Sequence, residues 1–308
     1  MQETHSKKHS NDFGDEINFV ELFNVLWDGK WIIISLTGFI SIVGVIYSLS
    51  LPNIYSSKAL LASVNSSSGI SGTLRGYAGF AGLAGISVPT AIDEGNSAKA
   101  IEKINSLSFF ENNILPNIFL PDLMALDSWD SDTNSMTYDE SIYNNATNTW
   151  LKIPSVQESF GEFGSHLSLF EDKKTGFISI AVKHQSPFIA KEWADLVVDE
   201  VNAFYRQKEK LESEKAVSYL NQQISITSLA EIKQVLAQLL QEETKKLTLI
   251  EANESFVFDY IDPPAVMEKK SEPRRAYICM IIAIIGGILS ISIVLIRHFI
   301  FNKKNLIN

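Results

Sequence analysis

The sequence contains a single cysteine, Cys279, in 308 residues. No intrachain disulfide can form, so any folded domain must be stabilised by its own core or by oligomerisation. The five histidines stand apart, none in an HExxH sequence or beside paired cysteines. The sequence therefore predicts no metal site and no cofactor, and we expect these isolated histidines at the surface.

Motifs of catalysis are also missing. The chain has neither a Gly-x-Ser-x-Gly elbow nor a Walker A sequence, which disfavours a hydrolase, kinase or ATPase. Acidic pairs such as Asp130 with Asp132 would serve a glycosidase only across a cleft, and solvated surface explains them better. We therefore predict no catalytic residues and no enzyme.

Charge is absent from two long runs, which extend from Trp31 to Leu51 and from Ala276 to Ile296. Each is long enough to cross a hydrocarbon core of roughly 30 Å as a helix. A cleavable signal peptide is disfavoured for the first run, because a mostly polar tail, residues 1–30, precedes it. Within this tail, apolar residues at near-helical spacing from Ile17 to Leu26 predict a short interfacial helix.

The two runs divide the chain into a tail at 1–30, spans at 31–51 and 276–296, a central domain at 52–275 and a tail at 297–308. Long loops cross membranes largely regardless of their charge, so we predict both tails in the cytoplasm and the central domain outside it. This domain carries 20 Lys and Arg against 30 Asp and Glu. Such an acidic surface is unsuited to nucleic acid.

Glycine and proline are both absent between Pro187 and Pro263, which predicts long helices over about 187–250. One continuous helix from Pro187 to Leu249 would reach roughly 95 Å, far beyond a compact domain of this size. A long projecting helix or a helical hairpin fits better. Because such an element has little core of its own, we expect it to pack against identical copies in a homo-oligomer.

The remaining segments predict a mixed α+β domain. We expect strands at 54–64 and 177–182, a returning strand at 256–262, a helix at 98–110 and irregular structure from there to Trp150. A Gly-rich stretch at 66–87 has Gly76, Gly79, Gly82 and Gly85 at a period of three. It is either a flexible apolar loop or one that packs on a neighbouring subunit or the membrane surface.

The residues that lead into the second uncharged run carry a recognisable spacing. Pro264 is followed by Pro273 and Arg274, and Gly286 and Ser290 lie within the run. This arrangement resembles the Wzz-type polysaccharide co-polymerases, the O-antigen chain length determinant family. Their pattern is Pro, two residues, Pro, four residues, Ser-Pro-Lys, eleven residues, Gly, three residues, Gly, and the chain departs from it at Met267, Glu272 and Ser290.

The residue types of this motif have physical reasons. Pro263 and Pro264 are expected to end the returning strand, and Pro273 to fix the direction in which the second span begins. Gly286 and Ser290 form a small-xxx-small face on which another helix can pack closely. An ordinary membrane-proximal turn with a packing glycine and a direct contact with a polymerase both remain open for this motif.

The resemblance implies a ring-forming inner-membrane protein with a periplasmic domain. It would act with the O-antigen polymerase, and on its lipid-linked glycan, to control chain length without catalysis. Because only residues 297–308 follow the second run, the simpler O-antigen type is implied, without a tyrosine-kinase extension. The alternative is a membrane-anchored ligand-binding or sensory ectodomain, and a glycosyltransferase or polymerase is a weaker third possibility.

Overall fold

The computed structural model describes residues 19–64, 94–253 and 255–305. These residues form two compact units. The first combines the amino-terminal segment up to Pro52 with the carboxyl-terminal segment from Glu272 onward, and the second extends from Asn53 to Ser271. The Gly-rich stretch and most of the amino-terminal tail lie outside the described residues, so the predictions about them remain predictions.

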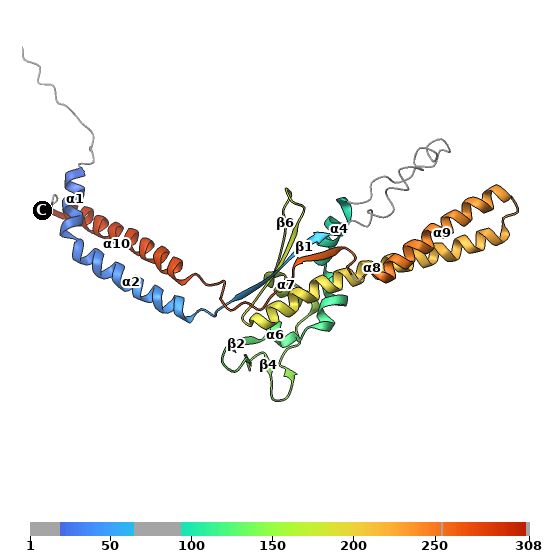
Figure 1. Ribbon diagram of the computed structural model, residues 1–308. Helices are drawn as coiled ribbons and strands as arrows, with labels where there is room; N and C mark the ends of the chain where they lie inside the picture. The colour runs from blue at the N-terminus through green and yellow to red at the C-terminus, as the bar shows by residue number, and fades with distance from the viewer. Residues whose placement is uncertain (1–18, 65–93, 254, 306–308) are drawn as a thin grey trace, which may run out of the picture. The chain divides into compact units, whose positions relative to one another are not determined.

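The described residues of the first unit form three helices (Figure 1): α1 (Phe19–Asp28), α2 (Lys30–Ser50) and α10 (Arg275–Asn305). Helices α2 and α10 pack along each other. Two helical segments, Lys30–Ser50 and Arg275–His298, are long and apolar enough to cross a membrane. The predicted spans thus coincide with helices, and helix α1 covers most of the segment that was predicted to be a short interfacial helix; its place at a membrane interface remains a prediction.

The second unit is built on a four-stranded antiparallel sheet in the order β6-β7-β1-β8. Its strands are β1 (Tyr55–Ser63), β6 (Leu167–Glu171), β7 (Ile178–His184) and β8 (Phe258–Asp262). Strict alternation of buried residues along β7 shows that one sheet face is covered, as the alternating sequence of this segment predicted.

Helix α8 (Pro187–Ile226) supplies the second layer. Its first half contacts β1 and β7, with Trp193, Val197 and Val201 almost fully buried. These residues recur at helical spacing, so they form one apolar stripe that faces Leu61 and Ile180 of the sheet within the core. The unit is therefore a helix-on-sheet arrangement, and the predicted α+β class is confirmed.

Beyond the sheet, α8 continues into a helical hairpin with α9 (Ala230–Ala252) (Figure 1). The chain turns at residues 227–229, where the sequence has weak helical character. Two ion pairs cross between the helices, Lys246 to Glu209 at 2.8 Å and Lys210 to Glu251 at 2.9 Å. Of the two arrangements open from sequence, the structure adopts the hairpin.

Two sequence predictions were wrong over residues 98–150. The single helix at 98–110 is two, α4 (Glu94–Ile104) and α5 (Leu107–Phe109), because Ser106 takes an extended conformation and its side chain caps α5. The stretch expected to be irregular is folded. It contains η1 (Phe110–Ile114), η2 (Leu115–Asn117), α6 (Leu120–Met124), β2 (Leu126–Asp130), β3 (Ser135–Tyr138), β4 (Tyr143–Asn144) and β5 (Thr149–Trp150).

The helix α7 (Val156–His166) was not predicted, although its signal was present. Ser155 and Glu158 form a capping box, in which each side chain accepts a hydrogen bond from the backbone N–H of the other. A Ser three residues before a Glu is a recognised helix start. The two glycines of α7 conceal it, because they lower helix propensity.

Candidate functional site

Two residues of the motif that resembles a known family, Gly286 and Ser290, lie at the interface between α2 and α10. On this interface a glycine in one helix, or directly before it, repeatedly lies beneath a β-branched side chain of the other helix. A Cβ added at each glycine would fall within 3.0 Å of that side chain; the three pairs are Gly29 with Val294, Gly44 with Ile282, and Gly286 with Ile40. Without side chains at these positions the two backbones can approach closely.

A polar contact fixes the same interface at its centre. The Thr37 hydroxyl donates to Ser290 Oγ at 3.1 Å, and Ser290 Oγ donates to the Gly286 carbonyl at 2.7 Å. Ser290 is fully buried. Ser290, which stands where the family pattern has glycine, therefore has a structural role. Its hydroxyl is hydrogen-bonded within α10 and also links α10 to α2.

Arg275, the first residue of α10, caps the end of α2. Its Nε donates to the Ser48 carbonyl at 3.1 Å and its Nη2 to the Leu51 carbonyl at 3.2 Å. The last carbonyls of a helix lack intrahelical partners and carry partial negative charge, so a guanidinium there is favourable. The sequence does not single out this residue, because Arg274 and Arg275 look alike in sequence.

The other motif residues divide between the two units. Pro273 is half-buried just before α10, and Arg274 is exposed. Pro263 and Pro264 follow the end of β8, with Pro263 exposed and Pro264 buried. The structure thus brings Gly286 and Ser290 together against α2, and places the proline pair in the sheet-bearing unit.

The segment after Pro264 is fastened to the start of β1. Ser57 Oγ donates to the Ala265 carbonyl at 2.8 Å, and Ser271 donates from its backbone N–H to the Ile54 carbonyl at 2.8 Å. Lys270 Nζ reaches Asn53 Oδ1 at 2.9 Å. The chain that enters and the chain that leaves this unit therefore run side by side.

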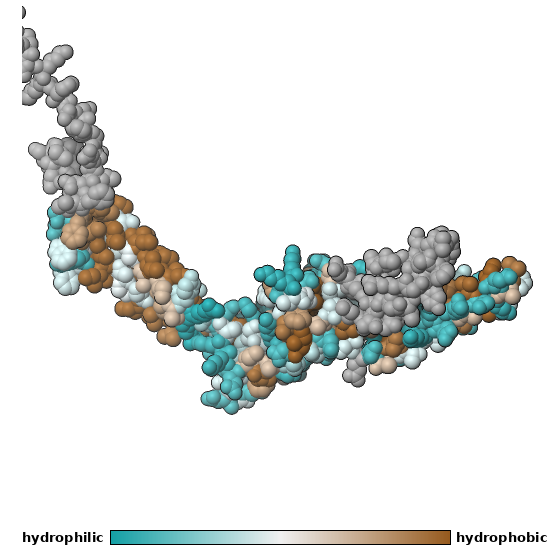
Figure 2. Space-filling model, turned by 45° about the horizontal axis from the view of Figure 1, so that its top comes forward, coloured by the Kyte–Doolittle hydropathy of each residue, from teal (hydrophilic) through white to brown (hydrophobic). Residues whose placement is uncertain are grey.

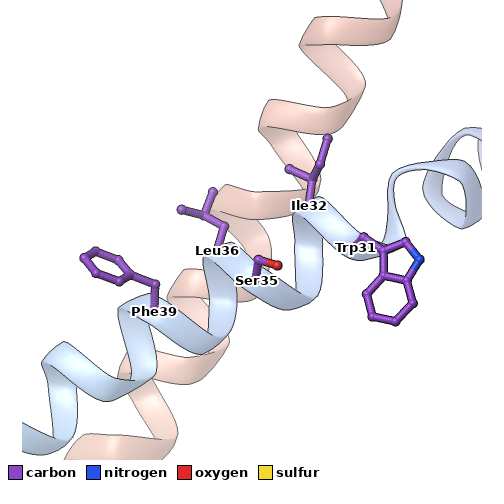
Figure 3. A pocket seen from close by; sticks show the side chains of 5 residues that line it. All are labelled: Trp31, Ile32, Ser35, Leu36 and Phe39. Atoms are coloured by element: carbon purple, nitrogen blue, oxygen red, sulfur yellow. The ribbon is translucent and has the colours of Figure 1, made fainter.

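A shallow hollow lies on α2 (Figure 3). It is lined by Trp31, Ile32, Ser35, Leu36 and Phe39. Trp31 and Phe39 are 72% and 65% exposed, and the only polar side chain is a serine. A substrate site needs several converging polar groups, so this hollow is better suited to apolar acyl chains.

A second hollow runs beside α8 in the other unit. Its lining includes Phe188, Lys191, Glu192, Asp195, Asp199 and Val266. Lys191 is bound to Asp195 at 2.6 Å. Burial, together with the negative charges of Asp195 and Glu200, raises the pKa of Asp199. The hollow is acidic, and no second cation from the described residues lines it.

His184 corrects the expectation that the histidines lie at the surface. It is 1% exposed, with Nδ1 accepting from the Ser186 N–H at 3.0 Å and Nε2 donating to the Asp122 carbonyl at 3.1 Å. Burial lowers its pKa to about 4. The neutral ring therefore joins β7, α6 and the start of α8.

The neighbouring carboxyl of Asp122 is also buried and accepts a hydrogen bond from the Tyr138 hydroxyl at 2.6 Å. Burial raises the pKa of Asp122. Tyr138 packs edge-on against Tyr143 and Phe119, so this group anchors the β2–β3 hairpin.

Within residues 19–64, 94–253 and 255–305, no three His, Cys, Asp or Glu side chains could hold a metal ion.

Comparison with known proteins adds a family match. Residues 15–112 match the model of the Wzz chain length determinant proteins. No curated protein matches the chain.

Two solved structures are similar to the chain. One, a full-length bacterial polysaccharide co-polymerase, is 14% identical with a TM-score of 0.41, over 92% of this chain and 99% of that one. The other, a fragment of WzzB, a polysaccharide co-polymerase from Salmonella Typhimurium, is 13% identical with a TM-score of 0.30, over 71% and 100%. At these scores neither likeness supports an argument.

Proposed function

We propose that the chain is a polysaccharide chain-length regulator, which sets the length of lipopolysaccharide O-antigen or a related surface polysaccharide. Residues 15–112 match the Wzz chain length determinant proteins. The domain match is the observation that carries this proposal. The matched residues include α1, α2 and β1, so they join a candidate span to the central strand of the sheet-bearing unit.

The proposed partner is the O-antigen polymerase of the inner membrane, together with its lipid-linked glycan. The protein would act without catalysis, by limiting how many repeat units the polymerase adds. The small-residue face of α10 does not provide the contact with the polymerase in this proposal. Gly286 and Ser290 already face Ile40 and Thr37 of the same chain, so a polymerase helix would meet the outward faces of the pair.

The proposed topology puts both ends of the chain in the cytoplasm and residues 52–275 in the periplasm. The two candidate spans in the described residues support the placement of both ends on one side, because an even number of crossings returns the chain to the side on which it began. A cysteine introduced at the exposed Lys174, in a Cys279→Ser background, should react with a membrane-impermeant maleimide once the outer membrane is permeabilised. Labelling only after lysis of the inner membrane would refute this topology.

The proposed assembly is a ring of identical copies, supported by the hairpin. On α9 the outward-facing Ile232, Val235 and Leu239 are 49%, 54% and 45% exposed, and they recur at helical spacing. Figure 2 shows apolar side chains toward the far end of the hairpin as well as over α2 and α10. An apolar stripe that the described residues leave uncovered is the kind of surface by which helices associate laterally.

The function is tested by the polysaccharide of a strain that lacks this gene. We expect its lipopolysaccharide ladder to change from a narrow modal length to an unregulated distribution, and the wild-type gene to restore the mode. Complete loss of polymer would instead indicate a polymerase or transferase. The alternative of a sensory ectodomain, which the comparisons do not support, predicts an unchanged ladder.

A further inference from the structure

The β4–β5 hairpin lies in a stretch of the sequence that has almost no charge. Between residues 141 and 157 the only charged residue is Lys152. The Lys152 ammonium is paired with Glu158, just beyond the stretch, at 3.2 Å. Because charged groups are the most costly to remove from water, this surface can leave water at a lower cost than the charged surfaces of the same unit.

Large apolar side chains of this stretch are nevertheless exposed. Leu151 and Ile153 are 67% and 75% exposed, and none of the exposed large apolar side chains among the described residues exceeds Ile153. Ile142 is 37% exposed, and its carbonyl accepts a hydrogen bond from the Leu151 N–H at 3.0 Å. The neighbouring pair, Tyr143 and Trp150, packs ring against ring on the inner side. Since side chains alternate between the two sides of a hairpin, Ile142, Leu151 and Ile153 form an apolar outer face.

Three contacts tie this hairpin to one end of the four-stranded sheet. The rings of Tyr143 and Tyr138 are 5.8 Å apart, and the Tyr138 hydroxyl donates to the Asp122 carboxylate at 2.6 Å. The Asp122 carbonyl in turn accepts from His184 at 3.1 Å. Within the sheet, His184 is the partner of Tyr55, the first residue of β1. The hairpin therefore lies at the end of the sheet where β1 begins.

Short pieces of chain connect the start of β1 to both candidate spans. Tyr55 follows Ser50, the last residue of α2, by five residues, so an extended chain carries it at most about 18 Å from that helix. On the return, the Ser271 N–H donates to the Ile54 carbonyl at 2.8 Å, and α10 begins only four residues later. A membrane crossed by both helices is therefore within reach of this end of the sheet, whatever the arrangement of neighbouring copies.

Acidic residues border the apolar outer face. Asp139 and Glu140 precede Ile142, and both are exposed. The Asp139 carboxylate accepts hydrogen bonds from the N–H and the hydroxyl of Ser141, at 2.8 and 2.6 Å. An exposed apolar face with a polar rim is typical of surfaces that bind a membrane or a protein. Because the rim is acidic, anionic head groups would be repelled, and zwitterionic lipid fits better.

We propose that the apolar outer face of the β4–β5 hairpin lies against the extracytoplasmic surface of the membrane, beside the two spans. Its occupant is zwitterionic phospholipid, with Ile142, Leu151 and Ile153 at the boundary between head groups and acyl chains, where exposed apolar side chains are stabilised. The contact rests on the proposed topology and goes beyond the proposed function. It gives the sheet-bearing unit an anchor in addition to the spans.

The test places an environment-sensitive dye on Ile153→Cys of the full-length protein, in a Cys279→Ser background. The protein is reconstituted into phosphatidylcholine vesicles, with and without phosphatidylcholine that carries a nitroxide near the head-group end of an acyl chain. A nitroxide quenches only a dye that it nearly touches. We expect the nitroxide lipid to abolish most of the fluorescence at residue 153. Leu151→Cys, on the same face, repeats the measurement if one variant fails to fold.

Two further positions serve as controls. Val235 is 54% exposed on α9, in the α8–α9 hairpin, and a dye on Val235→Cys should keep its fluorescence. Met280 is 58% exposed near the start of the second candidate span, and a dye on Met280→Cys should be quenched. The first control has the same apolar exposure without the connection to the spans, and the second reports whether α10 is in the membrane.

Each pattern of quenching decides the proposal. Quenching at residues 153 and 280 without quenching at 235 would support the lipid contact. Quenching at 280 alone would overturn the contact and leave the topology intact, and quenching at none of the three would overturn both. Blue-shifted emission at 153 without quenching would show that a second copy covers this face, which would also overturn the proposal.

Quenching at residue 235 as well as at 153 would show that the unit lies on the membrane along its length, and the specific role of the β4–β5 hairpin would be overturned. None of these readouts depends on polysaccharide length. Failure of the lipid contact is therefore distinguishable from failure of the proposed function, which the ladder of the deletion strain tests separately.

Discussion

Asn202 on α8 holds Phe258 at the start of β8 by two hydrogen bonds. Its Nδ2 donates to the Phe258 carbonyl and its Oδ1 accepts from the Phe258 N–H, both at 2.9 Å, while the same Oδ1 accepts from the Val257 N–H at 2.8 Å. The amide is buried. One side chain thereby fixes where the chain returns to the sheet after the α8–α9 hairpin.

Replacing Asn202 by leucine should lower the free energy of unfolding by about 3 kcal/mol, because three buried backbone groups lose their partner and water cannot replace it. The control is Asn221→Leu, on the exposed surface of the same helix. Thermal unfolding of the two purified variants measures the difference. Equal melting temperatures would show that Asn202 does not hold β8.

Replacing Gly286 by leucine should destabilise the pair of spans by about 1–3 kcal/mol, because even a Cβ there would lie 3.0 Å from Ile40 Cγ2. Gly287 is its control, since a Cβ at this position meets nothing within 4 Å. We expect Gly286→Leu to lower the melting temperature in detergent and to broaden the polysaccharide ladder, and Gly287→Leu to do neither. Indistinguishable variants would remove the packing role of this glycine.

Arg275→Ala should cost about 2 kcal/mol, because the last carbonyls of α2 lose a charged donor. The adjacent Arg274 is exposed, and Arg274→Ala removes the same charge without removing the cap. The comparison of melting temperatures in detergent therefore isolates the cap from the loss of net charge. If the two variants lost equal stability, a general effect of basic residues would explain the result better.

The buried His184 should make stability depend on pH. Its pKa is lowered from 6.5 to about 4 in the folded protein, so between these values the unfolded chain binds a proton that the folded chain does not. The free energy of unfolding should therefore fall by about 3 kcal/mol as the pH falls from 7 to 4.

The measurement is unfolding in denaturant across this pH range for the wild-type protein and His184→Gln. The raised pKa of Asp122 changes the free energy of unfolding in the opposite direction. Because this carboxyl binds its proton more tightly in the folded protein, its contribution to stability is lost as the pH rises. It is present in both proteins, so the difference between their slopes reports the histidine. Parallel slopes would contradict the assignment.

Part of the fold was readable from local sequence alone. The two apolar helices followed from the lack of charge in two runs, the long helices after Pro187 from the absence of glycine and proline, and β7 from its alternation. The folded stretch from Phe110 to Trp150 was not readable. Its strands are short, and an aromatic group around the buried Tyr143 stabilises them instead of any repeating pattern.

The candidate site, like the fold, was only partly predictable from the sequence. Sequence by itself determined that Gly286 and Ser290 lie one turn apart on a membrane helix, because a period of 3.6 residues is a property of the helix alone. Only the tertiary structure decided that this face meets Ile40 and Thr37, that Arg275 and not Arg274 caps α2, and that Asn202 meets Phe258. Each of these pairs depends on where distant backbones come to lie, which no local spacing encodes.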